Sequence, residues 1–382
     1  MKIMFSAGEV SGDIHGEQLT LAIRRMDPSA ELVGFGGTRM EAAGVRLYKN
    51  FADYNVMGIW EVLKNIRRLF ALLDGLTAFM REEKPDLLVI IDYPDFNWRL
   101  AKRARALGIP VFSYIPPSAW AWRKGRAAKC AKLADEFVAI FPHELPVYEK
   151  AGARISFVGN PLVDKVKPEM TRQEARDFFH MPKGETAVLL LPGSRRQEIE
   201  LLLPAMLQGA RKLLQAHPET VLYLPLADGI REGRIQSMID AASVPVTLVR
   251  DKRYALMAAA DAAVATSGTV VMEAALLGLP CVVLYRLSPV SYFVGRLLVH
   301  VKHFSLPNIL LDESFETELL QDEVTPDRIA EELWRLYPGN PHRAEVTAKL
   351  RQACERLGPP GASGRVAEKI LAAARRLSAG NQ

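Results

Sequence analysis

Short runs of apolar and β-branched residues alternate along this chain with longer stretches whose apolar positions recur at helical spacing. Residues 87–92 read LLVIID, and such an unbroken apolar run is typical of a parallel strand buried on both faces. In the first half we predict further strands at residues 2–6, 32–35, 111–115 and 136–140, with helices at 11–25 and 98–107. Strands that alternate with helices predict βαβ units and a doubly wound parallel sheet.

The alternation restarts after residues 163–170, which we interpret as a linker or an interdomain helix. A second set of strands is predicted at residues 186–191, 221–225, 246–249, 262–266 and 281–285, followed by terminal helices at 343–357 and 364–377. A chain of 382 residues fits two domains of roughly 150–200 residues each. We therefore predict an α/β protein with two Rossmann-like, doubly wound domains facing a cleft. The domains are residues 1–165 and 166–340, and the helices of residues 341–382 pack back on the first.

Composition narrows the class of protein only a little. Hydrophobic residues make up 49% of the chain and charged residues 24%, which is ordinary for globular proteins and excludes wholesale disorder. Cys130, Cys281 and Cys354 have no ligand spacing, so we interpret them as reduced thiols of a cytoplasmic protein. The first apolar run is too short for a signal peptide, and no run of roughly 18 apolar residues predicts a membrane helix.

The positive charge is more informative in its distribution than in its total of +5. Residues 60–73, WEVLKNIRRLFALL, place apolar side chains near one helical face and Lys64, Arg67 and Arg68 near the other. That pattern is typical of a helix at a membrane surface and, more commonly, of a helix that packs on a core. Residues 291–304 mix aromatic and basic residues similarly, and two such stretches favour an amphiphilic substrate. Only residues 120–132 approach a nucleic-acid-binding pattern, so we predict no nucleic-acid partner.

The loop at residues 266–269 of the second domain is the strongest candidate site, because ligands of doubly wound sheets bind beyond the carboxyl ends of the strands. It opens a helix, where Ser267, Gly268 and Thr269 can bind a diphosphate at free backbone N–H groups. Glu273, one turn later, can accept hydrogen bonds from a ribose diol. The alternative is an ordinary capped helix with a solvated Glu273.

A second loop, LPGSRR at residues 191–196, follows the strand that opens the second domain. It offers Ser194 and Arg195, and an arginine here can bind phosphate oxygens and neutralise the charge that develops on a leaving diphosphate. The Walker pattern, GxxxxGK followed by Ser or Thr, is absent from the sequence, which therefore does not predict ATP hydrolysis.

The loop GEVSGD at residues 8–13 opens the first domain and departs from the GxGxxG pattern. Its two acids would repel a pyrophosphate, so we predict an acceptor-side loop in which Glu9 and Asp13 hold sugar hydroxyls. Capping of the next helix by Ser11 or Asp13 is the alternative.

The loop DYPDFN at residues 92–97 follows the most hydrophobic strand. Asp95 is a candidate general base for an attacking hydroxyl, although it can instead cap the helix that follows. We expect Asp92 to accept backbone hydrogen bonds, and His15 is a rival base. The sequence has no DxD motif and no ligand cluster, so we predict neither a metal nor a cofactor.

These segments, in this order, resemble the bacterial lipid-A-disaccharide synthase family over nearly the whole chain. The most specific are GEVSGD at residues 8–13 and PPSAWAWR at 116–123. They are joined by IDYPDFN at 91–97, LPGSR at 191–195, SGTVVMEAALLGLPCVVLYR at 267–286 and SLPNIL at 305–310. The chain departs from the family at Asn160, where the family often carries histidine.

The resemblance implies a glycosyltransferase B fold and an inverting, metal-independent hexosyltransferase. Its donor would be UDP-2,3-diacylglucosamine and its acceptor 2,3-diacylglucosamine 1-phosphate (lipid X), giving the β-1,6-linked disaccharide 1-phosphate and UDP. The enzyme would be cytoplasmic and peripherally associated with the lipids of the inner membrane, and a homodimer is one possible state.

The positions that match the family's site are Glu9, Ser11, Asp95, Arg195, Glu273 and Asn308, with Asp95 as the base. Combined with the candidates from the loops themselves, Asp95 and Arg195 are the expected catalytic residues. The expected donor-binding residues are Ser194, Arg195, Ser267, Gly268, Thr269, Glu273 and Asn308. The expected acceptor-side residues are Glu9, Ser11, Asp13, Asn97 and Trp120.

Two other classes of function stay open on these residues. One is another UDP-sugar enzyme of the same fold, either a muramyl-lipid type of transferase or a UDP-sugar 2-epimerase. The other is a nonenzymatic nucleotide-sugar-binding protein, against which Asp95, Arg195 and Glu273 argue.

Overall fold

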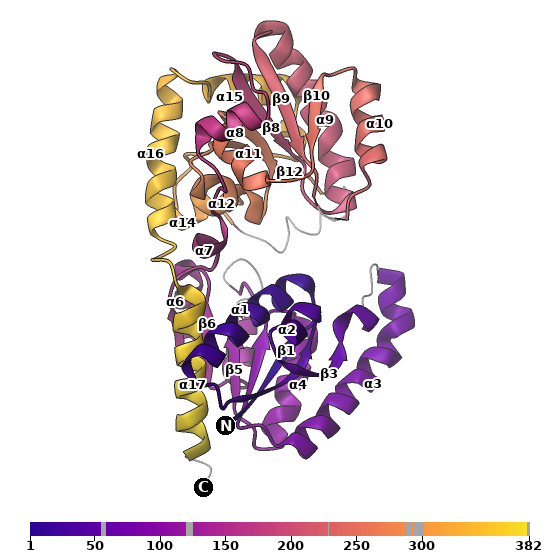
Figure 1. Cartoon of the computed structure of the whole chain (residues 1–382), viewed down its shortest axis with the longest axis vertical. Coiled ribbons are helices and arrows are strands. Elements are labelled where there is room, and N and C mark those ends of the chain that lie inside the picture. Colours follow the sequence, from indigo (N-terminus) through magenta and orange to yellow (C-terminus); the bar gives the residue numbers. More distant parts are fainter. Residues whose placement is uncertain (55–58, 120–124, 228, 288–291, 293–300, 380–382) are drawn as a thin grey trace. The chain divides into compact units, whose positions relative to one another are not determined.

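The chain forms two compact units, each a parallel sheet covered by helices (Figure 1). The computed structural model describes residues 1–54, 59–119, 125–227, 229–287, 292 and 301–379. Unit 1 comprises Met1–Pro161 with Pro359–Gln382, and unit 2 comprises Leu162–Gly358. The predicted class, two doubly wound α/β domains, is confirmed for each unit taken by itself.

Unit 1 contains a seven-stranded parallel sheet in the order β3-β2-β1-β4-β5-β6-β7. Its strands are β1 (Lys2–Ala7), β2 (Glu31–Gly36), β3 (Arg46–Asn50), β4 (Leu87–Ile91), β5 (Val111–Tyr114), β6 (Glu136–Ala139) and β7 (Ile155–Phe157). Its helices are α1 (Val10–Met26), α2 (Thr38–Ala42), α3 (Ile59–Glu83), α4 (Pro94–Ala106), α5 (Gly125–Ala131), α6 (Leu145–Glu149) and α17 (Ala362–Ala379).

The two faces of this sheet are covered by different helices. Alternate residues of a strand point to opposite faces, so Ile3 and Phe5 of β1 join one buried cluster and Met4 joins the other. The Ile3 cluster includes apolar residues of α1 and α17, whereas the Met4 cluster includes those of α3 and α4. Both faces of the central strands are therefore buried, which is why these strands read as continuous apolar runs.

Helix α17 belongs to unit 1 although it begins just over 200 residues after the end of β7 in the sequence. It packs along α1 and buries Val366 and Ile370 against the sheet. Arg365 donates hydrogen bonds to the carbonyl oxygens of Val158 (2.7 Å) and Pro359 (2.6 Å), and Arg376 forms an ion pair with buried Glu136 (2.9 Å). The contacts of Arg365 with Val158 and of Arg376 with Glu136 hold the two segments of unit 1 together.

Unit 2 contains a six-stranded parallel sheet in the order β10-β9-β8-β11-β12-β13. Its strands are β8 (Thr186–Leu191), β9 (Thr220–Pro225), β10 (Val246–Val249), β11 (Ala262–Thr266), β12 (Cys281–Tyr285) and β13 (Glu318–Leu320). Its longer helices are α9 (Arg196–Ala216), α10 (Glu232–Ala242), α12 (Thr269–Leu276), α15 (Pro326–Arg335) and α16 (Pro341–Glu355). The shorter ones are α7 (Leu162–Lys165), α8 (Arg172–Phe178), α11 (Arg253–Ala259) and α14 (Leu306–Leu311).

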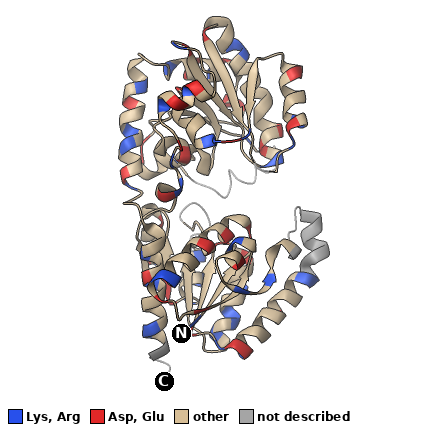
Figure 2. Cartoon of the chain, in the orientation of Figure 1, with Lys and Arg blue, Asp and Glu red and all other residues tan. Residues whose placement is uncertain are grey.

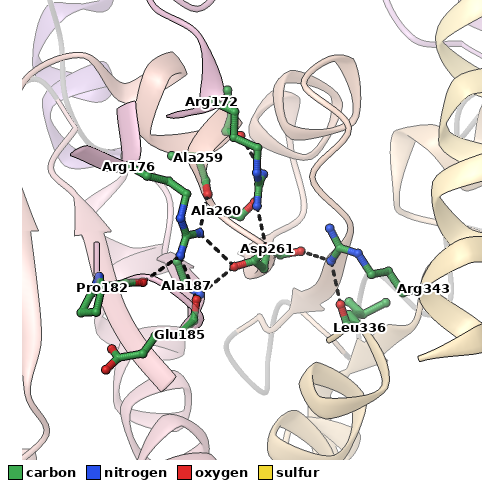
Figure 3. Close-up of polar contacts among 11 residues, drawn as sticks. Arg172, Arg176, Pro182, Glu185, Ala187, Ala259, Ala260, Asp261, Leu336 and Arg343 are labelled. Carbon is green, nitrogen blue, oxygen red and sulfur yellow. Dashed lines mark hydrogen bonds and ion pairs between the residues drawn. The ribbon is translucent and has the colours of Figure 1, made fainter. Parts of the chain in front are cut away.

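A buried carboxylate, Asp261, connects four elements of unit 2 at the amino ends of β8 and β11 (Figure 3). It accepts hydrogen bonds from Arg172 of α8 (2.6 Å), from Arg176 of the same helix (3.3 Å) and from the backbone N–H of Ala187 (2.9 Å). Its backbone oxygen accepts a further hydrogen bond from Arg343 of α16. A carboxylate with this many donors is stable when buried, and it fixes α8 and α16 to the start of the sheet.

The two terminal helices, expected to pack together on the first domain, separate in the structure. Helix α16 belongs to unit 2 and packs on α12 and α14, whereas α17 belongs to unit 1 and packs on α1. Arg343 explains the difference, because its bond to the Asp261 oxygen ties α16 to unit 2. The boundaries in the structure fall after Pro161 and before Pro359, rather than at the expected residues 165 and 340.

The two amphipathic stretches have different outcomes. The predicted helix at residues 60–73 is confirmed as the first part of α3, although the side chains of residues 59–66 lie outside the described residues. Most of the stretch at residues 291–304 also lies outside them. No helix in the described part of the chain is both long and apolar enough to cross a membrane.

Candidate active site

The loops singled out from the sequence lie at equivalent places in the two sheets. In unit 1 the strand order reverses between β1 and β4, and in unit 2 it reverses between β8 and β11. The loops that leave these four strands are residues 8–9, 92–93, 192–195 and 267–268. Ligands of doubly wound sheets bind beyond the carboxyl ends of the strands at this reversal point. Each unit therefore has its candidate loops where its fold favours a ligand.

A buried amide holds the two loops of unit 1 together. Asn97 accepts a hydrogen bond from the Ser6 hydroxyl (2.7 Å) and donates to the carbonyl oxygens of Asp92 (2.7 Å) and Ile91 (3.2 Å). Asn97 is completely buried, so its side chain joins β1 to β4 and does not face a ligand. The structure thus gives Asn97 a structural position instead of the expected acceptor-side one.

The acidic residue at the end of the GEVSGD loop is also internal. Asp13 is buried, and its carboxylate accepts hydrogen bonds from the backbone N–H groups of Gly37 (2.8 Å), Arg39 (3.1 Å) and Met40 (3.1 Å). It therefore caps the amino end of α2, where a negative charge is favourable. A sugar hydroxyl would have to displace these bonds, so the expected acceptor-side role of Asp13 does not fit its position.

The remaining residues of these loops form a tight turn. Asp92 and Tyr93 both have positive φ, 45° and 49°, a conformation that costs of order 1–3 kcal/mol per residue outside glycine. The Tyr93 ring lies over Gly8, where a Cβ atom would come within 2.2 Å of it. Strained backbone of this kind clusters at active sites, and here it places the start of α4 beside the start of α1.

Asp92 carries a perturbed carboxyl group. Burial, followed by the negative charge of Glu9, raises the pKa of Asp92 to about 6. Glu9 is half-buried in the loop after β1 and hydrogen-bonds to Asp92, so the two carboxyl groups lie side by side. The expectation that Asp92 only satisfies backbone donors missed this pairing.

We expect Asp92→Asn to stabilise the protein at neutral pH. The folded state binds the Asp92 proton more tightly than the unfolded chain, so the stability from this proton is present below about pH 4 and is lost as pH rises through about 6. Asparagine does not titrate, so the variant should gain about 3 kcal/mol in the free energy of unfolding at pH 8. Urea denaturation at pH 5 and pH 8 measures the difference, with Asp251→Asn at an exposed aspartate as the control. A gain of equal size at both pH values would contradict the assignment.

Asp95 has the opposite environment to its neighbours. It is the second residue of α4, its side chain is 96% exposed, and Arg126 of α5 donates a hydrogen bond to its Oδ1 at 3.1 Å.

The other candidate residues of unit 1 have different environments. Ser11 is exposed at the start of α1. The rival base, His15, places its ring edge-on to Tyr114, with 5.7 Å between ring centroids. Trp120 lies outside the described residues.

The LPGSR loop of unit 2 presents its arginine to solvent. Gly193 has a φ of +98°, and a Cβ atom there would meet Thr266 of β11 at 2.9 Å, so glycine allows the two loops to lie close together. Arg195 precedes α9, is 83% exposed and pairs with Glu198 (2.8 Å). Ser194 is exposed beside it.

The second loop of unit 2 opens α12. Gly268 and Thr269 are exposed at the amino end of this helix, where backbone N–H groups can bind an anion. Ser267 instead donates its hydroxyl hydrogen bond to the carbonyl oxygen of Phe304 (2.7 Å), which fixes the loop. Backbone groups and Thr269 are thus the parts of this loop that face outward.

Glu273 is neither solvated nor a helix cap. Its side chain is only 7% exposed, and its Oε1 accepts hydrogen bonds from the Tyr254 hydroxyl (3.1 Å) and from Arg253 (3.2 Å). The Arg253 guanidinium also lies over the Tyr254 ring, 4.8 Å from its centroid. This arrangement fixes the Glu273 carboxylate one turn into α12.

Asn308, expected to bind the donor, is buried in a polar network. Its amide nitrogen donates to the Glu316 carbonyl oxygen (2.9 Å) and to the Glu318 carboxylate (3.1 Å), and its oxygen accepts from the backbone of Glu316 (3.0 Å). Burial raises the pKa of Glu316 to about 8, and its carboxyl group bonds to Ser305 (2.8 Å). The segment SLPN (residues 305–308) therefore supports the neighbouring loop, and its Ser305 and Asn308 side chains are buried.

Three residues in this region were missed from the sequence: Arg126 beside Asp95, and Arg253 and Tyr254 beside Glu273. Each lies on a helix distant in sequence from its partner, so no local spacing connects them. For the two arginines the only sequence signal is that an arginine shortly after a predicted strand is suited to bind an anionic group. Tyr254 has no such signal.

Acidic and basic residues are both present on the helices of each unit (Figure 2). Within the described ranges, no three His, Cys, Asp or Glu side chains are grouped so that they could hold a metal ion. The expectations of no metal and no nucleic-acid partner stay predictions.

Two α/β units, each with a parallel sheet and with polar loops where the strand order reverses, are the features of the glycosyltransferase B fold. The chain therefore has the architecture of the enzymes that use this fold. Similar solved structures include a UDP-GlcNAc 2-epimerase from Neisseria meningitidis (TM-score 0.66, 15% identity, 97% of this chain and 100% of that one). They also include the calicheamicin glycosyltransferase CalG4 (TM-score 0.62, 15% identity, 98% of both chains). At such low identity these similarities concern the fold alone.

The chain belongs to the lipid-A-disaccharide synthetase family, whose model matches residues 3–361. It is 43% identical over 371 residues to the lipid-A-disaccharide synthase of Geobacter sulfurreducens, covering 97% of this chain and 96% of that one. It is 42% identical over 371 residues to that of Myxococcus xanthus, covering 97% of each chain. The chain is thus a hexosyltransferase of lipid A biosynthesis that acts on a UDP-sugar and a lipid X-type acceptor. The expected resemblance is confirmed, and the epimerase and nonenzymatic alternatives fall away.

Proposed function

We propose that the chain transfers 2,3-diacylglucosamine from its UDP derivative to the O6 hydroxyl of lipid X, with inversion, and that its own side chains carry this chemistry. Unit 1 binds the acceptor and unit 2 binds the donor. Asp95 removes the proton from the attacking hydroxyl, and Arg195 stabilises the leaving UDP. Inversion needs one base and an activated leaving group, and this division of roles supplies both.

The exposed carboxylate of Asp95 is the observation that carries this proposal. Of the polar groups at the reversal point of unit 1, Asn97 and Asp13 are buried and saturated with hydrogen bonds, and Asp92 is paired with Glu9. Asp95 alone among these four presents its carboxylate to solvent, held by Arg126. Glu9 and Ser11 lie at the adjacent start of α1, where they can bind sugar hydroxyls.

The donor half of the proposal rests on two helix starts. The amino ends of α9 and α12 offer backbone N–H groups next to Ser194, Arg195 and Thr269, and a diphosphate is favoured at such positions. Glu273 accepts two hydrogen bonds at Oε1, so its carboxylate has a fixed orientation from which Oε2 can accept the ribose hydroxyls.

Disaccharide synthesis from the two purified substrates tests this proposal. The protein is mixed with UDP-2,3-diacylglucosamine and lipid X in detergent with a chelator, and the products are analysed by mass spectrometry and by NMR of the anomeric centre. We expect a β-1,6-linked disaccharide 1-phosphate and UDP without added metal. An α-linkage, or synthesis only after a divalent ion is restored, would refute the inverting, metal-independent mechanism.

We expect Arg195→Ala to lower turnover by about 2 kcal/mol of transition-state stabilisation, or roughly 30-fold. This is at the low end for a lost electrostatic donor, because Arg195 is exposed and already paired with Glu198. Steady-state kinetics with both substrates saturating measures the change. Arg196→Ala is the matched control. Arg196 is the next residue in the chain, and it forms a similar exposed ion pair with Glu200 (2.8 Å). Equal turnover in both variants and the wild type would remove Arg195 from the mechanism.

We also propose that the enzyme is a cytoplasmic protein that associates peripherally with the inner membrane. The support is chemical: both substrates carry acyl chains, and the exposed residues Arg67, Arg68 and Phe70 of α3 combine charge with an aromatic ring. Flotation with anionic vesicles tests this, and protein that stays unbound at low salt would contradict it. Self-association stays a prediction, which sedimentation velocity over a range of concentrations decides.

A further inference from the structure

An apolar pocket of about 340 Å³ opens in unit 1 directly beside Asp95. Its walls come from α3 and from the first turns of α4, two helices that pack against each other. The residues used below line it: Leu69, Phe70 and Leu73 of α3, and Asp95, Phe96 and Arg99 of α4. The strained turn at Asp92 and Tyr93 sets the start of α4, and hence one wall of this pocket.

The pocket is apolar inside and charged at its edge. Leu73 and Phe96 are buried in the core behind it, whereas Phe70 is 43% exposed. Arg99 places its guanidinium 5.6 Å from the centre of the Phe70 ring, and Asp95 carries the other charge. An aromatic ring that stays this exposed beside a preformed hollow loses hydrophobic stabilisation unless a ligand covers it.

We infer that this pocket binds one fatty acyl chain of the acceptor sugar. Three observations favour that occupant. The lining is aliphatic and aromatic, as a hydrocarbon chain requires, and the volume is near the lower limit for a ligand site, which suits one chain better than a whole glycolipid. Asp95 lines the same pocket, so a chain seated there holds its own sugar next to the proposed base.

The inference deepens the proposed function and rests on it, because it uses an acceptor bound beside Asp95. A chain in the pocket positions the acceptor sugar next to Asp95. The pocket also selects acceptors by the length of their acyl chain. Each methylene group transferred from water to the pocket contributes about fourfold to kcat/KM until the chain reaches the end of the pocket. Longer chains gain nothing more there.

A series of lipid X analogues with progressively shorter acyl chains tests this inference. All assays use one fixed donor in detergent micelles, so no bilayer is present. For the wild type we expect log kcat/KM to rise with acceptor chain length and then to level. Leu69→Trp fills the pocket and should flatten this rise, and Phe70→Ala removes a wall and should reduce the preference for the long chain over the short one about tenfold.

Phe178→Ala is the matched control. Phe178 of unit 2 is also an exposed phenylalanine, 52% exposed, with Lys252 at 5.6 Å from its ring centre, and it lies outside the site. The control should keep both the activity and the chain-length profile of the wild type. If Leu69→Trp and Phe70→Ala keep that profile too, the pocket does not bind the acyl chain. Absence of disaccharide with the wild type would instead refute the proposed function, so the two failures are distinguishable.

Discussion

Asp95→Asn abolishes transfer, with a fall in kcat of about 10²–10⁴-fold, which is the usual contribution of a general base. Asparagine has nearly the same shape and can still accept the hydrogen bond from Arg126, but it cannot take up the proton of the attacking hydroxyl. UDP affinity should stay unchanged, because the proposed donor site lies in unit 2. Single-turnover kinetics and isothermal titration with UDP measure the two quantities.

The chain offers a close control for this experiment. Asp74 of α3 is another exposed aspartate of unit 1 that pairs with an arginine, Arg103 of α4. Asp74→Asn removes a comparable surface ion pair without touching the site, and it should leave kcat unchanged. Normal turnover in Asp95→Asn would rule out Asp95 as the base, and His15 would then be the next candidate.

Asp261→Asn destabilises unit 2 by about 3 kcal/mol. The substitution leaves Arg172 and Arg176 without their counter-ion at the start of the sheet, and removal of one partner from a buried ion pair costs about 3–5 kcal/mol. We place the effect at the lower limit because Arg172 is half exposed. For a unit of this size the expected fall in Tm is roughly 6–12 °C.

Differential scanning calorimetry measures this change. Asp327→Asn is the control, because Asp327 of α15 pairs with Lys212 at the surface of the same unit and exposed pairs contribute about 0–1 kcal/mol. The Asp261 cluster lies at the amino ends of the strands, opposite the candidate loops, so kcat well below the transition should not change. An unchanged Tm would mean that solvent already compensates the two arginines.

The central strands could be predicted from the sequence, whereas three of the four edge strands, β3, β7 and β13, could not. Central strands such as β4 and β8 are buried along their whole length and almost entirely apolar, which makes their pattern unambiguous. Strand β3 reads RLYKN, and β7 and β13 have three residues each. These edge strands exist because a neighbour provides hydrogen-bonding partners, which a local pattern does not record.

The loops at the reversal points of the two sheets could also be predicted, because they follow predicted strands and contain glycines and polar residues. The sequence could not distinguish a buried residue that stabilises a loop from an exposed residue that the loop directs toward a ligand. Asp13 and Asp95 are both acids in distinctive motifs, yet the first caps α2 and the second faces solvent. Burial depends on contacts with residues far away in sequence, such as Gly37 for Asp13.

The same limit applies to the pairs that orient the site. Glu273 was a candidate from the sequence, but its partner Tyr254 comes 19 residues earlier on another helix. Arg126 reaches Asp95 across 31 residues. Such pairs are set by the order of the strands, and the order became known only with the structure.

Helix α17 has a consequence for biosynthesis. The face of unit 1 that it covers is complete only after residue 362 has been made, roughly 200 residues after β7. At about 5–20 residues per second the ribosome needs roughly 10–40 s for that interval. Unit 2 is continuous in sequence and is synthesised during this interval, so unit 1, which is started first, is completed last. Until α17 has been made, one face of the apolar strands β1 and β4 is incompletely covered. A nascent chain that stalls before α17 therefore exposes an apolar surface that chaperones bind.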